Sequence, residues 1–521
     1  MQMEKTNNKK NNKKLLVVLI SVVAVVIIAL AVLLVVKFTS ENKNDPQDAP
    51  KTLDEIPDAK EGDDPSNVIS FKSEHYEVTN DMLNYFYRFD FYDSIDRYFD
   101  SYYQYYELDP TKDLKEQNCK MYQDKTGTWF DYFIAQSSVS IERFLLFAEA
   151  ALEQGNADDP QIQENVENDM NAIKSSASEY YKIPLEEFIS TRFGETVTEE
   201  EIRAALTLFY TGTIQYNKDI DSIKLNDSDL DKYYEEHKND FLYCDFRSYQ
   251  FKAKVSDDAS EAEKKKAYAE AEAKADELLK MNTVEKFVEW IRNYETSIND
   301  TLEEPYTEAE INYHATKVTG EYEYNDKTAF GKWAFAGDKK EGDMTVLDNG
   351  AGVYTVYYLV RSPYRLDYNT VNFRRILVDV DDFGGDMDKT LEKANELKEK
   401  WEATDKSEDS FTALAEEYDA NDTVYFEEVA LSDLERDLGA WCYDKERKPG
   451  DSELVSSEYG YYLVYFCGTG RQKWKIDANE ALMTERINAI FDGYTEKYPI
   501  KMNKNNLYLI SGVTAYTAKE K

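Results

Sequence analysis

The spacing of apolar and polar residues divides the chain into regions of different character. Residues 15–36 form an apolar run in which only Ser21 is polar. A helix of this length, at about 1.5 Å per residue, crosses a hydrocarbon core of roughly 30 Å. Lysines precede the run and the chain turns acidic after Lys37, so the positive-inside rule places the N-terminus in the cytoplasm. The sequence predicts a single membrane span from Leu15 to Val36, with the following residues outside.

A cleaved signal peptide is the alternative for this run, but its apolar segment is only about 7 to 15 residues and ends in a small-residue cleavage site. The run does not fit that pattern, and the first cysteine, Cys119, lies too far along the chain to carry a lipid anchor. We therefore expect residues 1–37 to be a cytoplasmic tail and an uncleaved transmembrane helix. Residues 38–67, with four prolines among acidic and polar residues, are predicted to be an extended acidic linker.

The next region has helical periodicity. From Thr79 onward, apolar residues recur at spacings of three and four, and many of them are Tyr or Phe. Thr198 and Glu201 form a capping box at the start of one predicted helix, and Gly155 marks the end of another. The pattern predicts an all-helical domain over 68–242. Its aromatic stripe is typical of a helix core, and the alternative is an aromatic surface that binds unfolded chains.

Beyond Cys244 the pattern changes to short strands, turns and one long charged helix, and a repeat becomes visible. WAFAGDKKEGD from Trp333 and WCYDKERKPGD from Trp441 share Trp, Lys, Gly and Asp at an offset of 108. GVYTVYY and GYYLVYF match at the same offset, and FRSYQF from Phe246 matches FRRILV from Phe373 at an offset of 127. We predict two tandem α+β domains, 243–366 and 367–474, followed by a C-terminal segment, 475–521.

Composition and charge narrow the range of functions. The 521 residues include 62 Lys and Arg against 103 Asp and Glu, a formal net charge of -41 that repels nucleic acid. The 41 Tyr and 25 Phe are far more than a disordered chain carries. Four cysteines are too few for a disulfide framework, although one bridge is possible, and they lack metal-ligand spacing. The acidic stretch 379–388 lacks the ligand pattern of a calcium loop, so neither metal nor cofactor is predicted.

The second repeat resembles a parvulin-type peptidyl-prolyl isomerase domain. The resemblance rests on VNFRRILV, FTALAEEY, a Gly-Asp turn and GYYLV in this order within about 100 residues. The first repeat is similar to a degenerate copy of the same domain. With the predicted anchor and the helical region, the layout resembles the extracytoplasmic folding factors of the PrsA/SurA type, whose helical chaperone domain is completed by the C-terminal segment of the chain.

The resemblance also points to candidate site residues and to a departure from the family. Its members usually carry histidine at two positions that hold Arg375 and Tyr462 here, and Ser248 and Tyr354 in the first repeat. Because proline isomerisation needs only preferential binding of the twisted imide, Tyr462 and Arg375 are the predicted catalytic residues. Trp441, Tyr443 and Phe411 are the predicted substrate-binding residues. An arginine on a strand of an acidic protein is also typical of an ion pair.

The fold class expected from these patterns is multidomain α+β: a transmembrane helix, an all-α SurA-like domain and two parvulin-like domains. The expected function is that of a folding factor anchored in a bacterial cell membrane, binding unfolded or newly secreted polypeptides outside the cytoplasm. Its activity is either peptidyl-prolyl isomerisation or binding alone, as a holdase. The alternative from a different class is a structural or adhesive surface protein. No nucleophile motif supports a hydrolase, and the sequence leaves the oligomeric state open.

Overall fold

The computed structural model describes residues 53–98, 103–122, 127–256, 259–302, 304–419 and 424–512. The predicted membrane span from Leu15 to Val36 lies outside these residues. Within them, no helix has both the length and the apolar character that crossing a membrane requires. The protein is a mixed α+β chain that forms two compact units. Unit 1 comprises Met1–Lys224 with Met483–Lys521, and unit 2 comprises Leu225–Leu482.

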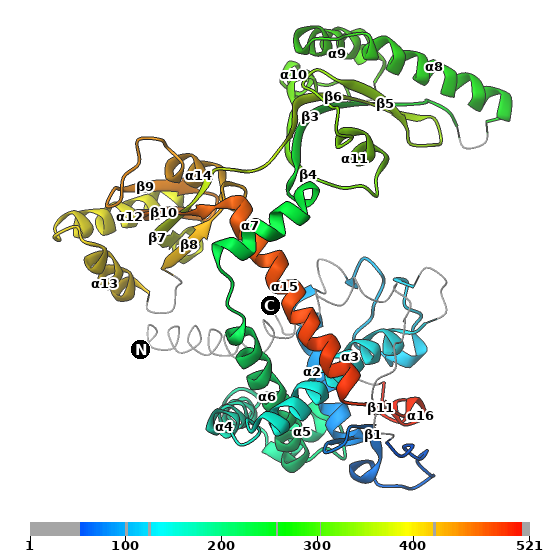
Figure 1. The fold of residues 1–521 in the computed structure, drawn as a ribbon, viewed down its shortest axis with the longest axis vertical. Helices are drawn as coiled ribbons and strands as arrows, with labels where there is room; N and C mark the ends of the chain where they lie inside the picture. The colour runs from blue at the N-terminus through cyan, green and yellow to red at the C-terminus, as the bar shows by residue number, and fades with distance from the viewer. Residues whose placement is uncertain are drawn as a thin grey trace. The chain divides into compact units, whose positions relative to one another are not determined.

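Unit 1 is mainly helical (Figure 1). Its elements are β1 (Ile69–Lys72), β2 (Glu77–Thr79), α2 (Asn80–Tyr98), α3 (Trp129–Gln154), α4 (Pro160–Ser175), α5 (Leu185–Phe193), α6 (Glu199–Ser222), β11 (Lys501–Met502), α16 (Lys504–Leu507) and the C-terminal part of α15 (Lys473–Lys497). Local sequence explains the helix ends. Thr198 forms the predicted capping box with Glu201, and Gly155 ends α3 with a left-handed φ of 74°.

A small sheet interrupts the helical region, so the prediction of an all-α domain is wrong here. β1 lies between β11 and β2, and both pairings are antiparallel. Phe71 pairs with Met502 on one side and with Val78 on the other. In Figure 1 the red β11 lies beside the blue β1. Strands of two to four residues, paired with a partner at the far end of the chain, leave no local periodicity in the sequence.

Asn506 holds the two ends of unit 1 together. Its Nδ2 donates hydrogen bonds to the carbonyl oxygens of Ile69 (2.7 Å) and Pro57 (3.1 Å), and its Oδ1 accepts from the Ala59 amide (3.0 Å). The predicted acidic linker, 38–67, is described from Leu53 onward, and this part is packed on the C-terminal segment. The linker is therefore not an extended tether from Leu53 onward, because the buried side-chain amide of Asn506 forms hydrogen bonds with its backbone groups.

The aromatic stripe on α2 is core. Five of its residues are buried, and Phe89 is partly buried against the same core: the buried five are Met82, Leu83, Tyr85, Phe86 and Tyr92. They pack against α3 and α6 in one large cluster, in which the rings of Phe144 and Phe209 meet edge to face at 4.8 Å. The helix-core interpretation of this stripe is confirmed, and the alternative of an aromatic client surface is wrong for these residues.

Unit 2 contains two modules, each built on one sheet. Its elements are α7 (Asp227–Glu236), β3 (Tyr243–Lys252), α8 (Glu261–Leu279), α9 (Val284–Ile298), α10 (Glu308–Thr316), β4 (Thr319–Glu323), α11 (Ala329–Ala334), β5 (Met344–Asp348), β6 (Val353–Tyr364), β7 (Asn369–Asp379), α12 (Met387–Glu402), α13 (Glu408–Tyr418), β8 (Tyr425–Val429), α14 (Arg436–Cys442), β9 (Ser452–Ser457), β10 (Gly460–Gln472) and the start of α15. Residues 225–242, predicted in the helical domain, belong to this unit.

The two sheets have the same antiparallel topology. The first module, β3 to β6, has the order β4-β3-β6-β5, and the second module, β7 to β10, has the order β8-β7-β10-β9. Each module runs from a strand through helices to a second strand, a short helix and a closing hairpin. In the first module α8 and α9 cover one face of the sheet and α11 the other (Figure 1). α12 and α13 likewise lie opposite α14 in the second.

Candidate functional site

Strand alternation divides the predicted site residues of the second module between two faces of the sheet. Phe373, Tyr462 and Val464 point toward α14, which contributes Leu438 and Cys442. Ile376, Leu463 and Tyr465 point to the opposite face, where Phe411 is fully buried against Trp401. The structure therefore places Phe411 away from Tyr462. Its prediction as a substrate-binding residue is wrong, because its ring is part of the core under α12 and α13.

Tyr462 is the centre of the face covered by α14. It is 2% exposed, and its hydroxyl donates a hydrogen bond of 2.6 Å to Oε1 of Glu435. Burial, together with this bond, raises the pKa of Tyr462 to about 12. The phenol is therefore neutral at physiological pH, and its single proton is already donated within the protein.

Arg375 lies beside Tyr462 on the neighbouring strand. Its guanidinium carbon is 4.6 Å from the ring centroid of Tyr462 and 4.5 Å from that of Phe426. Within the described residues, no carboxylate forms an ion pair with Arg375, whereas Arg374 on the other face pairs with Glu408 at 2.9 Å. The ion-pair expectation is thus wrong for Arg375, which is held between two aromatic rings by cation–π attraction.

The predicted substrate-binding residues Trp441 and Tyr443 also pack on this face. The guanidinium of Arg447 lies 3.9 Å from the Trp441 ring centroid, and its Nε donates to the Trp441 carbonyl at 3.0 Å. The Tyr443 hydroxyl donates to the carbonyl of Val429 at 2.9 Å. Four of the five predicted site residues therefore share one face, which we call the α14 face: Arg375, Trp441, Tyr443 and Tyr462.

Sequence reasoning missed Glu435 and Phe426, which complete this face. Glu435 is the N-cap residue of α14, where its side chain makes no capping hydrogen bond to the helix and instead accepts from Tyr462. Phe426 lies on β8 next to Phe373, with the two rings stacked at 5.1 Å. An acidic residue just before a short helix and an aromatic residue on an edge strand are common features, so neither signals a site.

The first module lacks a matching arrangement. In the first module Phe246 pairs with Leu359, and in the second module its counterpart Phe373 pairs with Phe466. Leu359 and Phe466 are therefore equivalent positions. They are 107 residues apart, one less than the offset of 108 that the sequence match predicts. The difference arises in the closing hairpin, which has three residues between Asn349 and Val353 but two between Ser457 and Gly460.

Because successive residues of a strand point to opposite faces, this shift of one residue places each side chain of β6 on the face opposite to the one that the sequence match predicts. Thr355, paired with Gln250, occupies the position of Tyr462, which pairs with Leu377. Tyr354 lies instead in the cluster under α8 and α9. The expected equivalence of Tyr354 and Tyr462 is wrong. At the positions of Arg375 and Tyr462 the first module holds Ser248 and Thr355, two small polar side chains.

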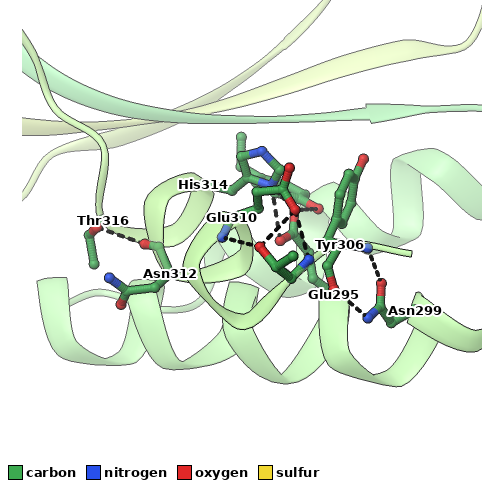
Figure 2. Close-up of polar contacts among 9 residues, drawn as sticks. Glu295, Asn299, Tyr306, Glu310, Asn312, His314 and Thr316 are labelled. Atoms are coloured by element: carbon green, nitrogen blue, oxygen red, sulfur yellow. Dashed lines mark hydrogen bonds and ion pairs between the residues drawn. The ribbon is translucent and has the colours of Figure 1, made fainter. Parts of the chain in front are cut away.

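A buried carboxylate in the first module was also missed. Glu295 on α9 is 3% exposed, and it accepts a hydrogen bond of 2.9 Å from the hydroxyl of Tyr249. Nδ1 of His314 lies 3.1 and 3.2 Å from its two carboxylate oxygens, and the ring of Tyr306 packs edge to face on His314 (Figure 2). Glu295 follows Ile291 by four residues on the buried side of α9, and this spacing was the available sequence signal.

The cysteines are not arranged for chemistry. All four are free thiols, and burial raises the pKa of Cys244, Cys442 and Cys467 to about 12 in each case. They are therefore protonated and weakly nucleophilic. In the part of the chain that the structure describes, no group of three His, Cys, Asp or Glu side chains is placed to hold a metal ion.

No family model matches the sequence. A search of curated proteins likewise finds no match.

Proposed function

We propose that this protein is a folding factor that acts outside the cytoplasm, is anchored by residues 15–36, and binds unfolded or newly secreted polypeptides. The single observation that carries the proposal is the pair of modules with one topology, each closed by the same Gly-Asp turn. The amide of Gly342 donates to Leu359 and that of Gly450 to Phe466, so the turn meets the last strand in the same way in both. This arrangement is the one expected of two parvulin-like domains in tandem.

The organisation of unit 1 supports the same proposal. Residues 483–512 fold with the N-terminal helices, so unit 2 is inserted in the sequence between the two parts of unit 1. A helical domain completed by the C-terminal segment is what the resemblance to PrsA/SurA-type folding factors implies. The net charge of -41 favours cationic clients and keeps a client-binding protein soluble.

Within this proposal, the α14 face is the candidate isomerase site. A twisted X-Pro imide has a more basic nitrogen, because its amide resonance is broken and the nitrogen lone pair is free. Arg375 carries a cationic donor on this face and can donate a hydrogen bond to that nitrogen, which stabilises the twisted form over the planar one. Tyr462 positions Arg375 through its ring and Glu435 through its hydroxyl.

The holdase alternative is favoured by one specific observation, the commitment of the Tyr462 proton to Glu435. A hydroxyl that is buried and already donating offers no proton to an imide nitrogen. If the α14 face cannot donate to a substrate, the modules bind clients without accelerating isomerisation.

The experiment compares cis/trans relaxation of a proline tetrapeptide with suppression of client aggregation, using the full-length chain in detergent. Arg375→Met and Tyr462→Phe are tested beside the matched controls Arg374→Met and Tyr461→Phe, which alter the opposite face. An isomerase loses about tenfold or more in kcat/KM in Arg375→Met, the value of one charge-assisted hydrogen bond, and little in the controls.

The outcomes separate the three functions. Acceleration that is lost in Arg375→Met and kept in Arg374→Met supports an isomerase at the α14 face. Suppressed aggregation with no acceleration supports the holdase. Failure of both assays with folded protein overturns the folding-factor proposal and favours the structural or adhesive alternative.

A further inference from the structure

Unit 1 contains a cavity of about 1000 Å³ that the proposed function does not use. Its walls come from residues 59–68, the N-terminal half of α2, the end of α5 with its connection to α6, and residues 509–511. The volume is at the upper end of the range for sites that bind small molecules or short peptides. We call it the α2 cavity.

One face of α2 lines this cavity with polar side chains. Asp81, Asn84 and Arg88 recur at helical spacing and are 1%, 8% and 5% exposed. Buried Asp and Arg side chains are rare in proteins unless they are paired with opposite charges. Asp81 and Arg88 lie seven residues apart on α2, and among the described residues no ion pair joins their side chains.

The hydrogen bonds of these residues leave capacity for a ligand. Nε of Arg88 donates to Oδ1 of Asn84 at 3.1 Å, and within the described residues no carboxylate forms an ion pair with Arg88. Oδ1 of Asp81 accepts from the hydroxyl of Thr196, while Oδ2 is buried without a partner. Such a group costs free energy until a donor reaches it, so the cavity presents one unmet acceptor and one cation without a counter-charge.

We propose that the α2 cavity binds a short peptide of two or three residues with free ends, its ammonium group at Asp81 and its carboxylate at Arg88. Seven residues of α-helix advance by about 10.5 Å along the backbone, and the Arg88 side chain reaches back to Asn84, so the two charged groups are closer together than this. An extended peptide advances by about 3.3 Å per residue, so two or three residues span such a distance. The Arg88 guanidinium suits a carboxylate because it donates two parallel hydrogen bonds. The proposal does not depend on the folding function proposed above.

The charges around the cavity agree with such a ligand. Glu61, Asp63 and Glu195 line it together with Lys60, so the lining outside α2 is acidic on balance. This charge attracts the ammonium end of a peptide and favours peptides with an additional cationic side chain. A free fatty acid or a dicarboxylate would satisfy Arg88 but would leave Asp81 without a donor.

The test is isothermal titration calorimetry of the full-length chain in detergent with trialanine and its end-capped derivatives. We expect trialanine to bind, the N-acetylated and the C-amidated forms to bind at least tenfold more weakly, and single alanine to bind more weakly still. Equal binding of a peptide capped at both ends would overturn the proposal, since it would indicate recognition of the backbone of a longer client. The absence of trialanine binding would also overturn it.

Variants assign each end of the peptide. Asp81→Asn should weaken trialanine but not its N-acetylated form, and Arg88→Met should weaken trialanine but not its C-amidated form. The matched controls Asp437→Asn and Arg436→Met remove the same charges from an exposed pair in unit 2 and should change neither. If a variant fails to fold, the comparison of free and capped peptides binding to the unaltered chain remains the test of the proposal. Equal losses for capped and free peptides would contradict the assignment.

Discussion

The hydroxyl of Tyr462 on β10 donates a hydrogen bond of 2.6 Å to Glu435, the residue at which α14 begins. The bond joins a central strand of the second module to the short helix that covers one of its faces. It also uses the only proton of the phenol. The structural role of Tyr462 can therefore be measured separately from any role in isomerisation.

Tyr462→Phe should lower the free energy of unfolding of the chain by about 1 kcal/mol, because it removes one hydrogen bond to a charged acceptor. Water bound to Glu435 replaces part of that bond. Urea unfolding followed by tyrosine and tryptophan fluorescence gives this value. Tyr461→Phe is the control, because its side chain lies on the opposite face. Equal stabilities of Tyr462→Phe and the unaltered chain would show that the Glu435 contact contributes nothing.

Arg375→Lys should also destabilise the second module, by about 1 kcal/mol. An ammonium keeps the charge but loses the planar contact with the two rings of Phe426 and Tyr462. Arg374→Lys should cost less, since Arg374 makes a partly exposed ion pair with Glu408. The urea midpoints of the two variants check this order, and the reverse order would contradict the cation–π assignment.

Asp90 should make the stability of unit 1 depend on pH. Burial raises its pKa from 3.8 to about 7, and the hydrogen bond from Ser137 offsets only part of this rise. Because the folded chain holds this proton more tightly than the unfolded chain, the contribution of Asp90 is full below pH 4. It is lost as the pH rises through 7.

Asp90→Asn removes this titration. The variant should match the unaltered chain near pH 4 and be more stable by about 1 to 3 kcal/mol at pH 8, where the folded chain must hold Asp90 ionised in a buried site. Urea unfolding at several pH values between these limits gives the curve. Asp221→Asn, an exposed residue in the same unit, should show no such change. A constant difference across the pH range would refute the assignment to Asp90.

Glu295→Gln should destabilise the first module by about 1 to 3 kcal/mol. The amide oxygen still accepts from Tyr249, but the charge that faces His314 is removed and one amide hydrogen must find an acceptor in a buried site. Glu289→Gln, exposed on the same helix, is the matched control. Thermal unfolding of both variants tests the expectation, and equal midpoints would mean that the cluster in Figure 2 is not stabilising.

Gly460→Ala should be far more disruptive than Gly384→Ala in the same module. Gly460 has a φ of +131°, and a Cβ there would lie 2.2 Å from the carbonyl oxygen of Val378. Gly384 has a φ of +67° with nothing within 4 Å of an added Cβ. The second change should cost about 1 kcal/mol for the left-handed conformation alone, and the first several times more. Comparable urea midpoints for the two variants would argue against the close approach of β10 to β7.

Much of the secondary structure could be read from the sequence, because its signals are local. The capping residue Thr198, the terminator Gly155 and the Gly-Asp turns each act within a few residues of themselves. The division of unit 2 into two α+β modules also followed from the sequence, since a repeated pattern of local signals requires no knowledge of contacts. The alternation of β7 and β10 brings Arg375 and Tyr462 to one face.

The remaining features depend on contacts between distant residues. The sequence by itself determined the acidic, aromatic-rich composition, most helix ends and the two repeated modules. Only the tertiary structure decided that Phe411 is core, that Thr355 rather than Tyr354 matches Tyr462, and that β11 pairs with β1. One extra residue in the hairpin before β6 reverses which face of the sheet each β6 side chain occupies. The buried side-chain amide of Asn506 joins the two ends of unit 1. Neither effect leaves a periodic trace in the chain, because both are set by which segments meet in space.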